Sequence, residues 1–369
     1  MPPTAPDAAE GHFPLTRNPA PASDAERARR LDNPAFGVHF TDHLVRATWR
    51  DGEDWSDRRV EPFDDLRIHP AATGLNYGQQ IFEGLKAYRW DDGSVALFRP
   101  DANASRFAAS ARRMALPELS EADFVGSLEA LVSVDRAWVS SAPDASLYLR
   151  PLLIGSEAWL AVRPSRTAEY VVIASPVGPY FATGVKPVAI WVSQGYHRAN
   201  LGGTGTAKAG GNYGAAMLPQ LEAEARGCGQ VLYLDARTNT LVEELGAMNL
   251  LVVMRDGSVV TPRLTGTILA GVTRESLLAI LRDEGREVVE HDLPLEELRT
   301  GIESGDVAEV FACGTAAVIV PVGRLVSPTF FVEVGDGGPG EVTMAVRERL
   351  VGIQYGRVED SFGWMRVVS

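Results

Sequence analysis

Lysine is rare in this 369-residue chain, and its rarity narrows the search for amine chemistry. Of the 35 basic residues only three are lysine, namely Lys86, Lys186 and Lys208. Genome composition explains most of such a bias, because exposed lysine is readily replaced by arginine. A guanidinium cannot act as a nucleophilic amine, whereas a lysine amine can form a Schiff base. These three residues are therefore the candidates for any Schiff-base chemistry.

Lys208 stands in a glycine-rich segment, LGGTGTAKAGGNYG, at residues 201–214. Glycine permits positive φ and a close approach of the backbone to a ligand. The segment is not a phosphate-binding P-loop, because alanine stands on both sides of Lys208, and it does not contain G-x-G-x-x-G. These residues alone leave a catalytic lysine and a structural loop as equal alternatives.

Two acidic residues, Glu243 and Glu244, interrupt the apolar stretch LVEELGAMNLLVVM, which is typical of a strand. Neighbouring side chains of a strand point to opposite faces, so one carboxylate can face a pocket while the other faces solvent. A buried carboxylate needs a cationic or hydrogen-bonding partner. Two exposed charges at a sheet edge remain the alternative, because alternation does not choose a face.

Two further stretches, AGVTRESLL and CGTAAV, place small residues and threonines at turns. The first opens a predicted helix, where backbone amides can bind a phosphate. Thr273 can equally be an ordinary N-cap. We expect no metal site, since His39 and His43 lie on a predicted strand without a third ligand.

Composition excludes several classes of function. The net charge of −13 argues against nucleic acid as a partner. No apolar run approaches the roughly 18 residues of a membrane span. The two cysteines form no Cys-x-x-Cys pair, which favours a reducing, cytoplasmic setting. Residues 1–32 are rich in proline and alanine without the core of a signal peptide, and we expect a mobile N-terminal arm.

The elements that must position these residues alternate irregularly. The first half is predicted to contain strands and hairpins over 36–100, helices at 101–116 and 121–139, and strands at 146–155 and 169–177. The second half is predicted to contain a strand at 188–193, helices at 215–227 and 274–285, and strands between and after them, with a hairpin turn at Asp256-Gly257. Because there is no regular βαβ alternation, we predict an α+β fold in two domains.

As a set, these motifs and three others resemble the branched-chain amino-acid aminotransferases, which are fold type IV pyridoxal-phosphate enzymes. The added motifs are FEGLKAY (82–88), SLYLRPLLIG (146–155) and IQYGRVED (353–360), and the resemblance in the acidic stretch lies in EELGAMNL (243–250). The resemblance runs from about residue 33 to the C-terminus. It implies a homodimer of β-rich domains with flanking helices, divided into a small domain at 33–176, a linker at 177–187 and a large cofactor-binding domain at 188–369.

The resemblance also assigns roles to residues. Lys208 would carry the Schiff base with pyridoxal 5'-phosphate and shuttle the proton, and Glu244, not Glu243, would pair with the pyridine nitrogen. The remaining cofactor contacts would come from Arg106, Tyr213, Val272, Thr273 and Thr315. The substrate pocket would be formed by Tyr77, Phe82, Tyr148, Arg150, Ala247 and Ala316. A loop containing Leu160 and Val162 would reach the site of the partner subunit.

The implied reaction is amino-group transfer between Leu, Ile or Val and 2-oxoglutarate, with Arg150 meeting the distal carboxylate of glutamate. Ala247 departs from relatives that carry threonine there, and Ala317 and Val320 stand where some animal forms have a Cys-x-x-Cys pair. The alternatives are D-amino-acid aminotransferase or aminodeoxychorismate lyase of the same fold, or a binding protein without activity. The motifs YLRP and FEGLKAY favour the branched-chain group.

Overall fold

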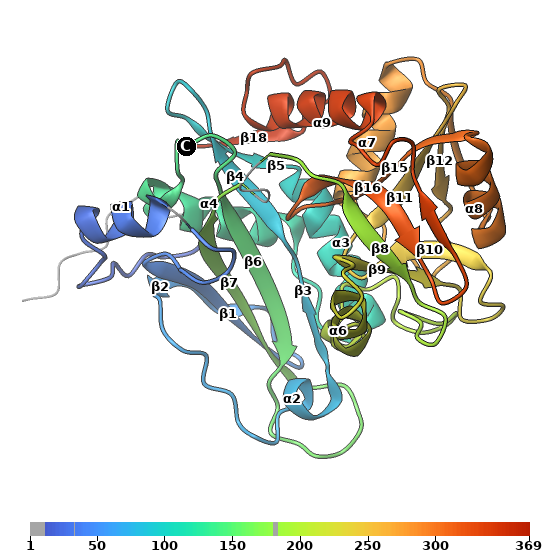
Figure 1. Cartoon of the computed structure of the whole chain (residues 1–369). Helices are drawn as coiled ribbons and strands as arrows, with labels where there is room; N and C mark the ends of the chain where they lie inside the picture. The colour runs from blue at the N-terminus through green and yellow to red at the C-terminus, as the bar shows by residue number, and fades with distance from the viewer. Residues whose placement is uncertain (1–11, 33, 180–183) are drawn as a thin grey trace, which may run out of the picture. The chain divides into compact units, whose positions relative to one another are not determined.

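The computed structural model describes residues 12–32, 34–179 and 184–369. The chain divides into two compact units. Unit 1 comprises Met1–Pro179 and Gln354–Ser369, and unit 2 comprises Tyr180–Ile353. Each unit contains one β-sheet with helices packed on it, which confirms the α+β prediction (Figure 1). Within the described residues, no helix combines the length and apolar character needed to cross a membrane.

The sheet of unit 1 is antiparallel throughout, in the order β18-β5-β4-β6-β7-β1-β2, with β3 paired to β6. Its longest strands are β6 and β7, and both ends of each strand lie within two residues of the predicted bounds. The strands are β1 (His43–Arg50), β2 (Ser56–Pro62), β3 (Gln80–Phe82), β4 (Leu85–Arg89), β5 (Val95–Phe98), β6 (Ser146–Gly155), β7 (Thr167–Val177) and β18 (Met365–Val368).

Two long helices of unit 1 follow the expected patterns with earlier ends. Helix α3 (Pro100–Arg113) buries Ala104, Phe107 and Ala111 on one face. It ends before the expected residue 116 because Ala115 adopts a positive φ of 52°. Helix α4 (Glu121–Val134) is capped by the Ser120 hydroxyl and is followed by a separate 3-10 turn, η1 (Arg136–Trp138). The remaining helical segments are α1 (Asp24–Asp32) and α2 (Thr73–Tyr77).

The N-terminal segment differs from a free arm where the structure describes it. Phe13 is buried, and the Thr16 amide donates to Val60 O at 2.8 Å. The Asn18 amide donates to the buried ring of His43 at 2.9 Å. Residues 12–18 are thus held against β1 and β2, because the backbone groups of edge strand β2 offer hydrogen bonds. The expectation of a mobile arm over residues 1–11 lies outside the described residues.

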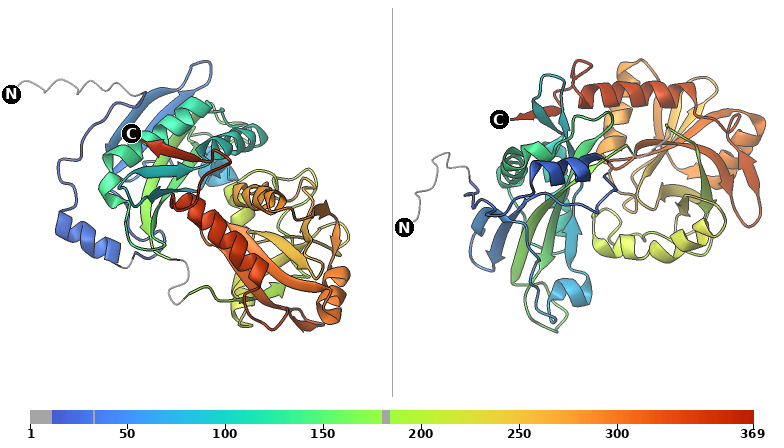
Figure 2. Two further views of the ribbon diagram at one scale, coloured as in Figure 1. Left: turned by 90° about the horizontal axis from the view of Figure 1, so that it is seen from above. Right: turned by 60° about the vertical axis from the view of Figure 1, so that its left-hand side comes forward.

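The C-terminal segment also differs from the expected grouping. Strand β18 pairs with β5, from Met365 opposite Phe98 to Val368 opposite Val95 (Figure 2). Residues 354–369 therefore belong to unit 1, although the sequence suggested one continuous domain over 188–369. The pairing of two strands that are distant in the sequence places residues 354–369 in unit 1. Local sequence patterns do not predict such pairing. The linker proposed at 177–187 includes residues 180–183, which are not described.

The sheet of unit 2 is mixed, in the order β13-β12-β11-β15-β16-β8-β9-β10-β14, with β17 paired to β16. Strand β8 runs parallel to both β9 and β16. The strands are β8 (Val188–Val192), β9 (Gln230–Leu234), β10 (Leu241–Leu245), β11 (Asn249–Met254), β12 (Val259–Pro262), β13 (Val288–His291), β14 (Leu293–Pro294), β15 (Val307–Gly314), β16 (Val318–Val326) and β17 (Phe331–Glu333). The helices are α5 (Gly210–Gly214), α6 (Met217–Glu224), α7 (Val272–Asp283), α8 (Leu295–Ser304) and α9 (Glu341–Gln354).

The apolar stretch around Glu243 and Glu244 forms two strands, β10 and β11, where the sequence indicated one. A turn at 246–248 separates them, closed by the Leu245 amide donating to Met248 O at 2.8 Å. These two strands are far apart in the sheet order although only three residues join them. The sheet therefore curls until β10 and β11 meet, and this curl determines what surrounds the two carboxylates.

Candidate active site

Lys208 lies at the end of the glycine-rich loop, directly before helix α5. Its side chain is half-buried, and its Nζ is 3.0 Å from the Tyr213 hydroxyl. Asn212 holds the loop in shape, because its buried amide donates to the carbonyls of Thr204 and Ala207 at 2.8 and 3.0 Å. A Cβ at Gly205 would lie 2.4 Å from Thr267 O, so glycine is needed where the loop meets its neighbour.

Glu244 is the buried acid of the site. Its carboxylate pairs with the Arg198 guanidinium at 2.9 Å, and both side chains are almost fully buried. It also accepts the Leu269 amide at 2.7 Å and the Asn249 amide group at 3.2 Å. Burial raises the pKa of Glu244 to about 7, against the opposing effect of Arg198. The Lys208 charge also lowers this pKa, so the amine lies near enough to the acid for their charges to interact.

Glu243 is also buried, which excludes the alternative of two exposed edge charges. Its Oε1 accepts the Thr267 hydroxyl, and its pKa is raised by burial despite this bond. Glu243 and Glu244 lie next to each other on β10, so their side chains leave the strand on opposite faces. The curled sheet buries both faces, which period-2 alternation could not reveal.

The shifted pKa of Glu244 makes a prediction about stability. Its ordinary value is 4.5 and its value in the folded chain is about 7, so the folded cofactor-free protein binds this proton more tightly than the unfolded chain. Its contribution is therefore complete below pH 4.5 and is lost as the pH rises through 7. Relative to Glu244→Gln, the wild-type free energy of unfolding should fall by up to about 3 kcal/mol between pH 4 and pH 8.

Urea unfolding of both cofactor-free proteins at the two pH values measures this difference. The glutamine variant removes the titrating group and keeps the shape of the side chain. A wild-type protein that gains stability relative to the variant on going to pH 8 would contradict the raised pKa.

Helix α7 begins at Val272 and Thr273, both of them buried. Gly271 is its N-cap and provides no side-chain cap, and the first amides of a helix have no partner within it. A Cβ at Gly271 would lie 2.0 Å from Asn249 Oδ1. Asn249 thus links the start of the helix to Glu244. The second turn, Thr315–Ala317 between β15 and β16, is followed by Val318 at φ 63°, a strained position for a β-branched residue.

In unit 1, Arg106 on α3 is fixed by a fully buried carboxylate. Its Nε and Nη2 donate to the two oxygens of Glu83 at 2.7 and 2.8 Å. Such a bidentate pair sets the plane of the guanidinium. Glu83 belongs to the FEGLKAY motif and follows β3 directly.

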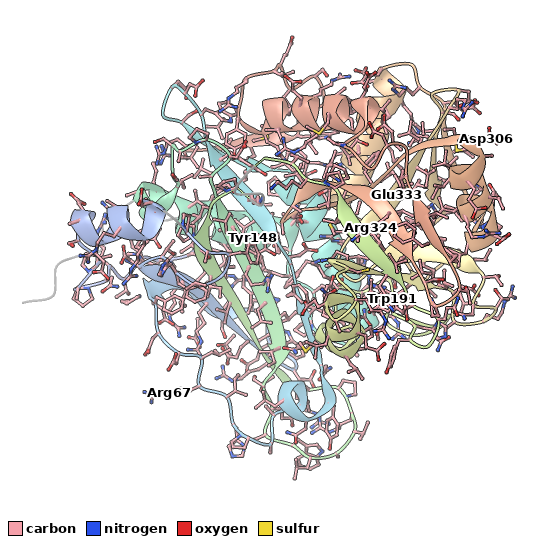
Figure 3. All side chains as sticks on the ribbon, in the orientation of Figure 1. Arg67, Tyr148, Trp191, Asp306, Arg324 and Glu333 are labelled. Carbon is pink, nitrogen blue, oxygen red and sulfur yellow. The ribbon has the colours of Figure 1, made fainter. Side chains whose placement is uncertain are left out.

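Arg150 is a cation of unit 1 that lies against two aromatic rings. It lies over the ring of Phe82 at 4.7 Å and over that of Tyr148 at 5.2 Å, and donates to the Tyr148 hydroxyl at 2.9 Å. Its Nε is buried without a hydrogen-bond partner. Among the residues that the structure describes, Arg150 forms no ion pair with a carboxylate. Figure 3 shows Tyr148, its neighbour on β6.

Tyr77, Leu160 and Val162 lie at another part of unit 1. The Tyr77 hydroxyl donates to Leu160 O, which ties α2 to the loop at 156–166. All three side chains are exposed, Val162 to 86%. Ala247 is likewise exposed in its turn in unit 2, and Ala316 is half-buried.

The structure therefore brings some of the predicted residues together within each unit and leaves Tyr77 with the loop of Leu160 and Val162. Unit 2 brings together Lys208, Tyr213 and Glu244, and unit 1 brings together Phe82, Tyr148 and Arg150. Sequence reasoning missed Glu83 and Arg198, which are the buried partners of Arg106 and Glu244. The sequence signal available for Glu83 was an acidic residue next to an apolar strand. Arg198 had no such signal, because it is one of many arginines in the chain.

Comparison with known proteins finds similarity to aminotransferases. The amino-transferase class IV family matches residues 80–325. Branched-chain-amino-acid aminotransferase of Mycolicibacterium smegmatis is 48% identical over 96% of this chain and 97% of that protein. The crystal structure of Escherichia coli branched-chain amino acid aminotransferase is similar, with a TM-score of 0.73 at 28% identity over 88% of this chain and all of that one.

A second solved structure contains a phosphopyridoxyl adduct of glutamate. It is the T.th. branched-chain amino acid aminotransferase complexed with N-(5'-phosphopyridoxyl)-L-glutamate, with a TM-score of 0.71 and 28% identity over 88% of this chain and 98% of that one. The family match covers well over half of the chain, and its residues include the amine, the buried acid and the helix start described above. This chain belongs to the class IV aminotransferases.

Proposed function

We propose that this protein transfers the amino group between branched-chain L-amino acids (Leu, Ile and Val) and 2-oxoglutarate, giving branched-chain 2-oxo acids and L-glutamate. Its cofactor is pyridoxal 5'-phosphate. The observation that carries the proposal is the Lys208 amine next to the Tyr213 hydroxyl, in a site whose buried acid is Glu244.

The side chains of unit 2 fit this cofactor. A primary amine can bind its aldehyde, and a buried carboxylate with a pKa of about 7 can bind a protonated ring nitrogen. The start of α7 offers amides and the Thr273 hydroxyl to a phosphate. Val272, Thr273 and Thr315 would hold the phosphate, and Arg106 would add a guanidinium oriented by Glu83.

The residues of the chain have distinct tasks in the reaction. Bound pyridoxal phosphate supplies an electron sink for the negative charge that develops at the substrate Cα. Lys208 Nζ removes the proton from this Cα, and the Tyr213 hydroxyl at 3.0 Å orients the amine. Glu244 holds the ring nitrogen protonated, and Arg198 with the Leu269 amide holds the carboxylate in place.

Arg150 would bind the distal carboxylate of the second substrate, glutamate. Leucine brings an apolar side chain, for which the rings of Phe82 and Tyr148 offer walls, with Tyr77 beside the loop of Leu160. Glutamate brings a second carboxylate, and Arg150 lacks a carboxylate partner among the described residues. The turns at Ala247 and Ala316 would offer backbone amides to the α-carboxylate. One pocket would thus accept both amino donors.

The assembly and setting of the enzyme are further parts of the proposal. Leu160 and Val162 are exposed apolar residues, as expected of a loop that contacts a second subunit. We propose a homodimer on this ground. The cytoplasmic location remains a prediction from cysteine content and charge.

An assay of amino transfer to 2-oxoglutarate tests the function directly. L-Leu, L-Ile and L-Val should each yield glutamate with purified protein and added pyridoxal phosphate, and D-Ala should yield none. Transfer from D-Ala alone would instead indicate a D-amino-acid aminotransferase.

Replacing Glu244 by glutamine should slow transamination about 10²- to 10³-fold, because the amide keeps the shape of the carboxylate and loses its charge. Cofactor retention should change much less, since the phosphate contacts remain. Single-turnover kinetics with leucine and the visible absorbance of the bound cofactor separate the two effects. Glu243→Gln removes the neighbouring charge, and its loss of rate should be far smaller. Equal losses from both variants would contradict the assignment of Glu244 to the cofactor.

A further inference from the structure

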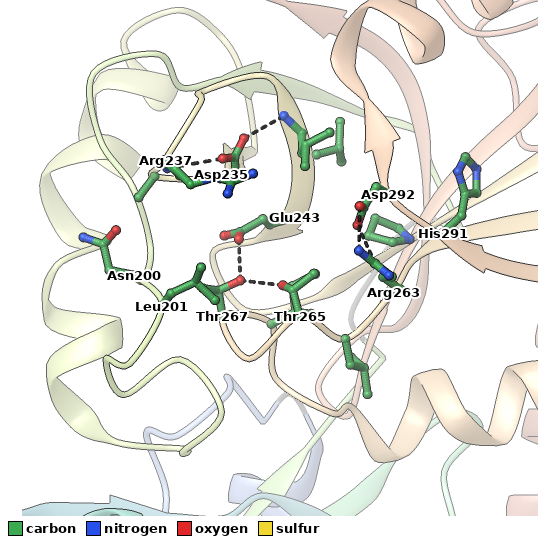
Figure 4. A pocket seen from close by; sticks show the side chains of 16 residues that line it. Asn200, Leu201, Asp235, Arg237, Glu243, Arg263, Thr265, Thr267, His291 and Asp292 are labelled. Carbon is green, nitrogen blue, oxygen red and sulfur yellow. Dashed lines mark hydrogen bonds and ion pairs between the residues drawn. The ribbon is translucent and has the colours of Figure 1, made fainter.

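Unit 2 contains a pocket of about 700 Å³ on the Glu243 side of strand β10. Its walls come from the segments around Asn200, Asp235, Glu243, Thr265 and His291 (Figure 4). Lys208, Tyr213 and Glu244 do not line it. Its volume is in the range of sites for small molecules.

One buried oxygen in this pocket has no partner. Glu243 is 5% exposed, and its Oε1 accepts the Thr267 hydroxyl. Its Oε2 is buried without a hydrogen-bond partner among the described residues. Figure 4 shows the carboxylate extending into the space between Asp235 and Thr267. Buried carboxylate oxygens are normally hydrogen-bonded, so this atom indicates a missing donor.

None of the other charged groups of the pocket donates to Glu243 Oε2. Among the described residues, no hydrogen bond or ion pair joins Arg237 or His291 to Glu243. Arg263 donates to both oxygens of Asp292 at 2.6 and 2.8 Å. The Asp235 carboxylate accepts the backbone amides of its own turn, including that of Leu241 at 2.8 Å. The guanidinium of Arg198 pairs with Glu244. Arg198 is thus paired with Glu244, and among the described residues Glu243 forms no ion pair with a cation.

Part of the remaining lining is apolar, beside the polar side chains of Asn200, Arg237, Thr265, Thr267 and His291. Leu201 and Leu264 flank the pocket with 64% and 44% of their surfaces exposed, and Val242, Pro262 and Ile268 contribute further apolar surface. Such walls accept an alkyl group and exclude a strongly hydrated ion. A ligand that joins an N–H cation to a short branched alkyl chain would satisfy both parts of the pocket.

We propose that this pocket binds a small protonated alkylamine, with Glu243 as its counter-ion. The ammonium group donates to Glu243 Oε2, and the alkyl group packs on Leu201, Leu264 and Ile268. This site is separate from the cofactor site, and its occupancy does not depend on Lys208.

Isothermal titration of the holoenzyme with N,N-dimethylisobutylamine tests the proposal. A tertiary amine is protonated at neutral pH and cannot condense with the cofactor, so it reports non-covalent binding only. We expect saturable binding of one amine per chain in the wild type and in Lys208→Arg. Glu243→Gln should weaken binding by about tenfold or more, because a hydrogen bond to a charged group is lost.

Two further variants make the test sharper. Glu287→Gln makes the same change of charge at an exposed residue outside the pocket and should leave amine binding unchanged. Ala236→Trp fills the pocket from a surface turn and should abolish binding, which gives an independent result if Glu243→Gln does not fold. If no saturable binding is seen up to about 10 mM amine, the binding free energy is weaker than about −3 kcal/mol. This result would indicate a pocket filled by solvent only and would overturn the proposal.

Equal affinity in wild type, Glu243→Gln and Ala236→Trp would also overturn it, because the amine would then bind elsewhere. Loss of binding in Lys208→Arg would place the amine in the cofactor site and overturn it as well. The assay of amino transfer fails or succeeds separately, since it uses no alkylamine.

Discussion

Replacing Lys208 by arginine should abolish transamination and leave the fold intact. The guanidinium cannot form a Schiff base and scarcely accepts a proton near neutral pH. The loss of the general base alone corresponds to about 10²- to 10⁴-fold in rate, and the loss of the nucleophile adds to it. The side chain is half-buried at the end of a loop, so a longer cation can be accommodated without disturbing the core.

Leucine transamination and the visible absorbance of the lysine-bound cofactor measure this effect, and circular dichroism checks the fold. Lys186→Arg is the matched control, since Lys186 is exposed and should tolerate the same exchange. A Lys208→Arg protein with near-normal turnover and absorbance would mean that Lys86 or Lys186 carries the Schiff base.

Replacing Arg150 by methionine should separate the two substrates of the enzyme. Glutamate and 2-oxoglutarate should lose far more than leucine, because only the dicarboxylates place a second charge in the side-chain pocket. Removing one partner of a buried charge pair costs about 2 to 5 kcal/mol. At 1.36 kcal/mol per tenfold, this is roughly 30-fold to several thousand-fold in kcat/KM for the dicarboxylates.

Single-turnover kinetics of each half-reaction measure the two losses separately. Arg226→Met is a suitable control, because Arg226 also lies over an aromatic ring, that of Trp191 at 4.4 Å, outside the substrate pocket. Equal losses for leucine and glutamate in Arg150→Met would show that Arg150 supports the pocket or binds the α-carboxylate instead.

Much of the local structure followed from the sequence alone. Strand β6 has the predicted bounds of 146–155, helix α3 begins within one residue of its predicted start, and Asp256-Gly257 lies between the paired strands β11 and β12. These features depend on residues that are near each other in the chain, namely on alternation, helical spacing and turn chemistry. Composition likewise isolated three lysines, and the ordered motifs selected Lys208 from them.

The tertiary structure alone decided the environment of the charged groups. Arg198 and Glu83 became functional candidates only because folding buries them against Glu244 and Arg106. Both carboxylates of β10 are buried because the sheet curls, although alternation along one strand permits either face to be exposed. The C-terminal strand joined unit 1 through pairing with β5. Each of these outcomes depends on contacts between residues that are distant in sequence, so local patterns could not predict them.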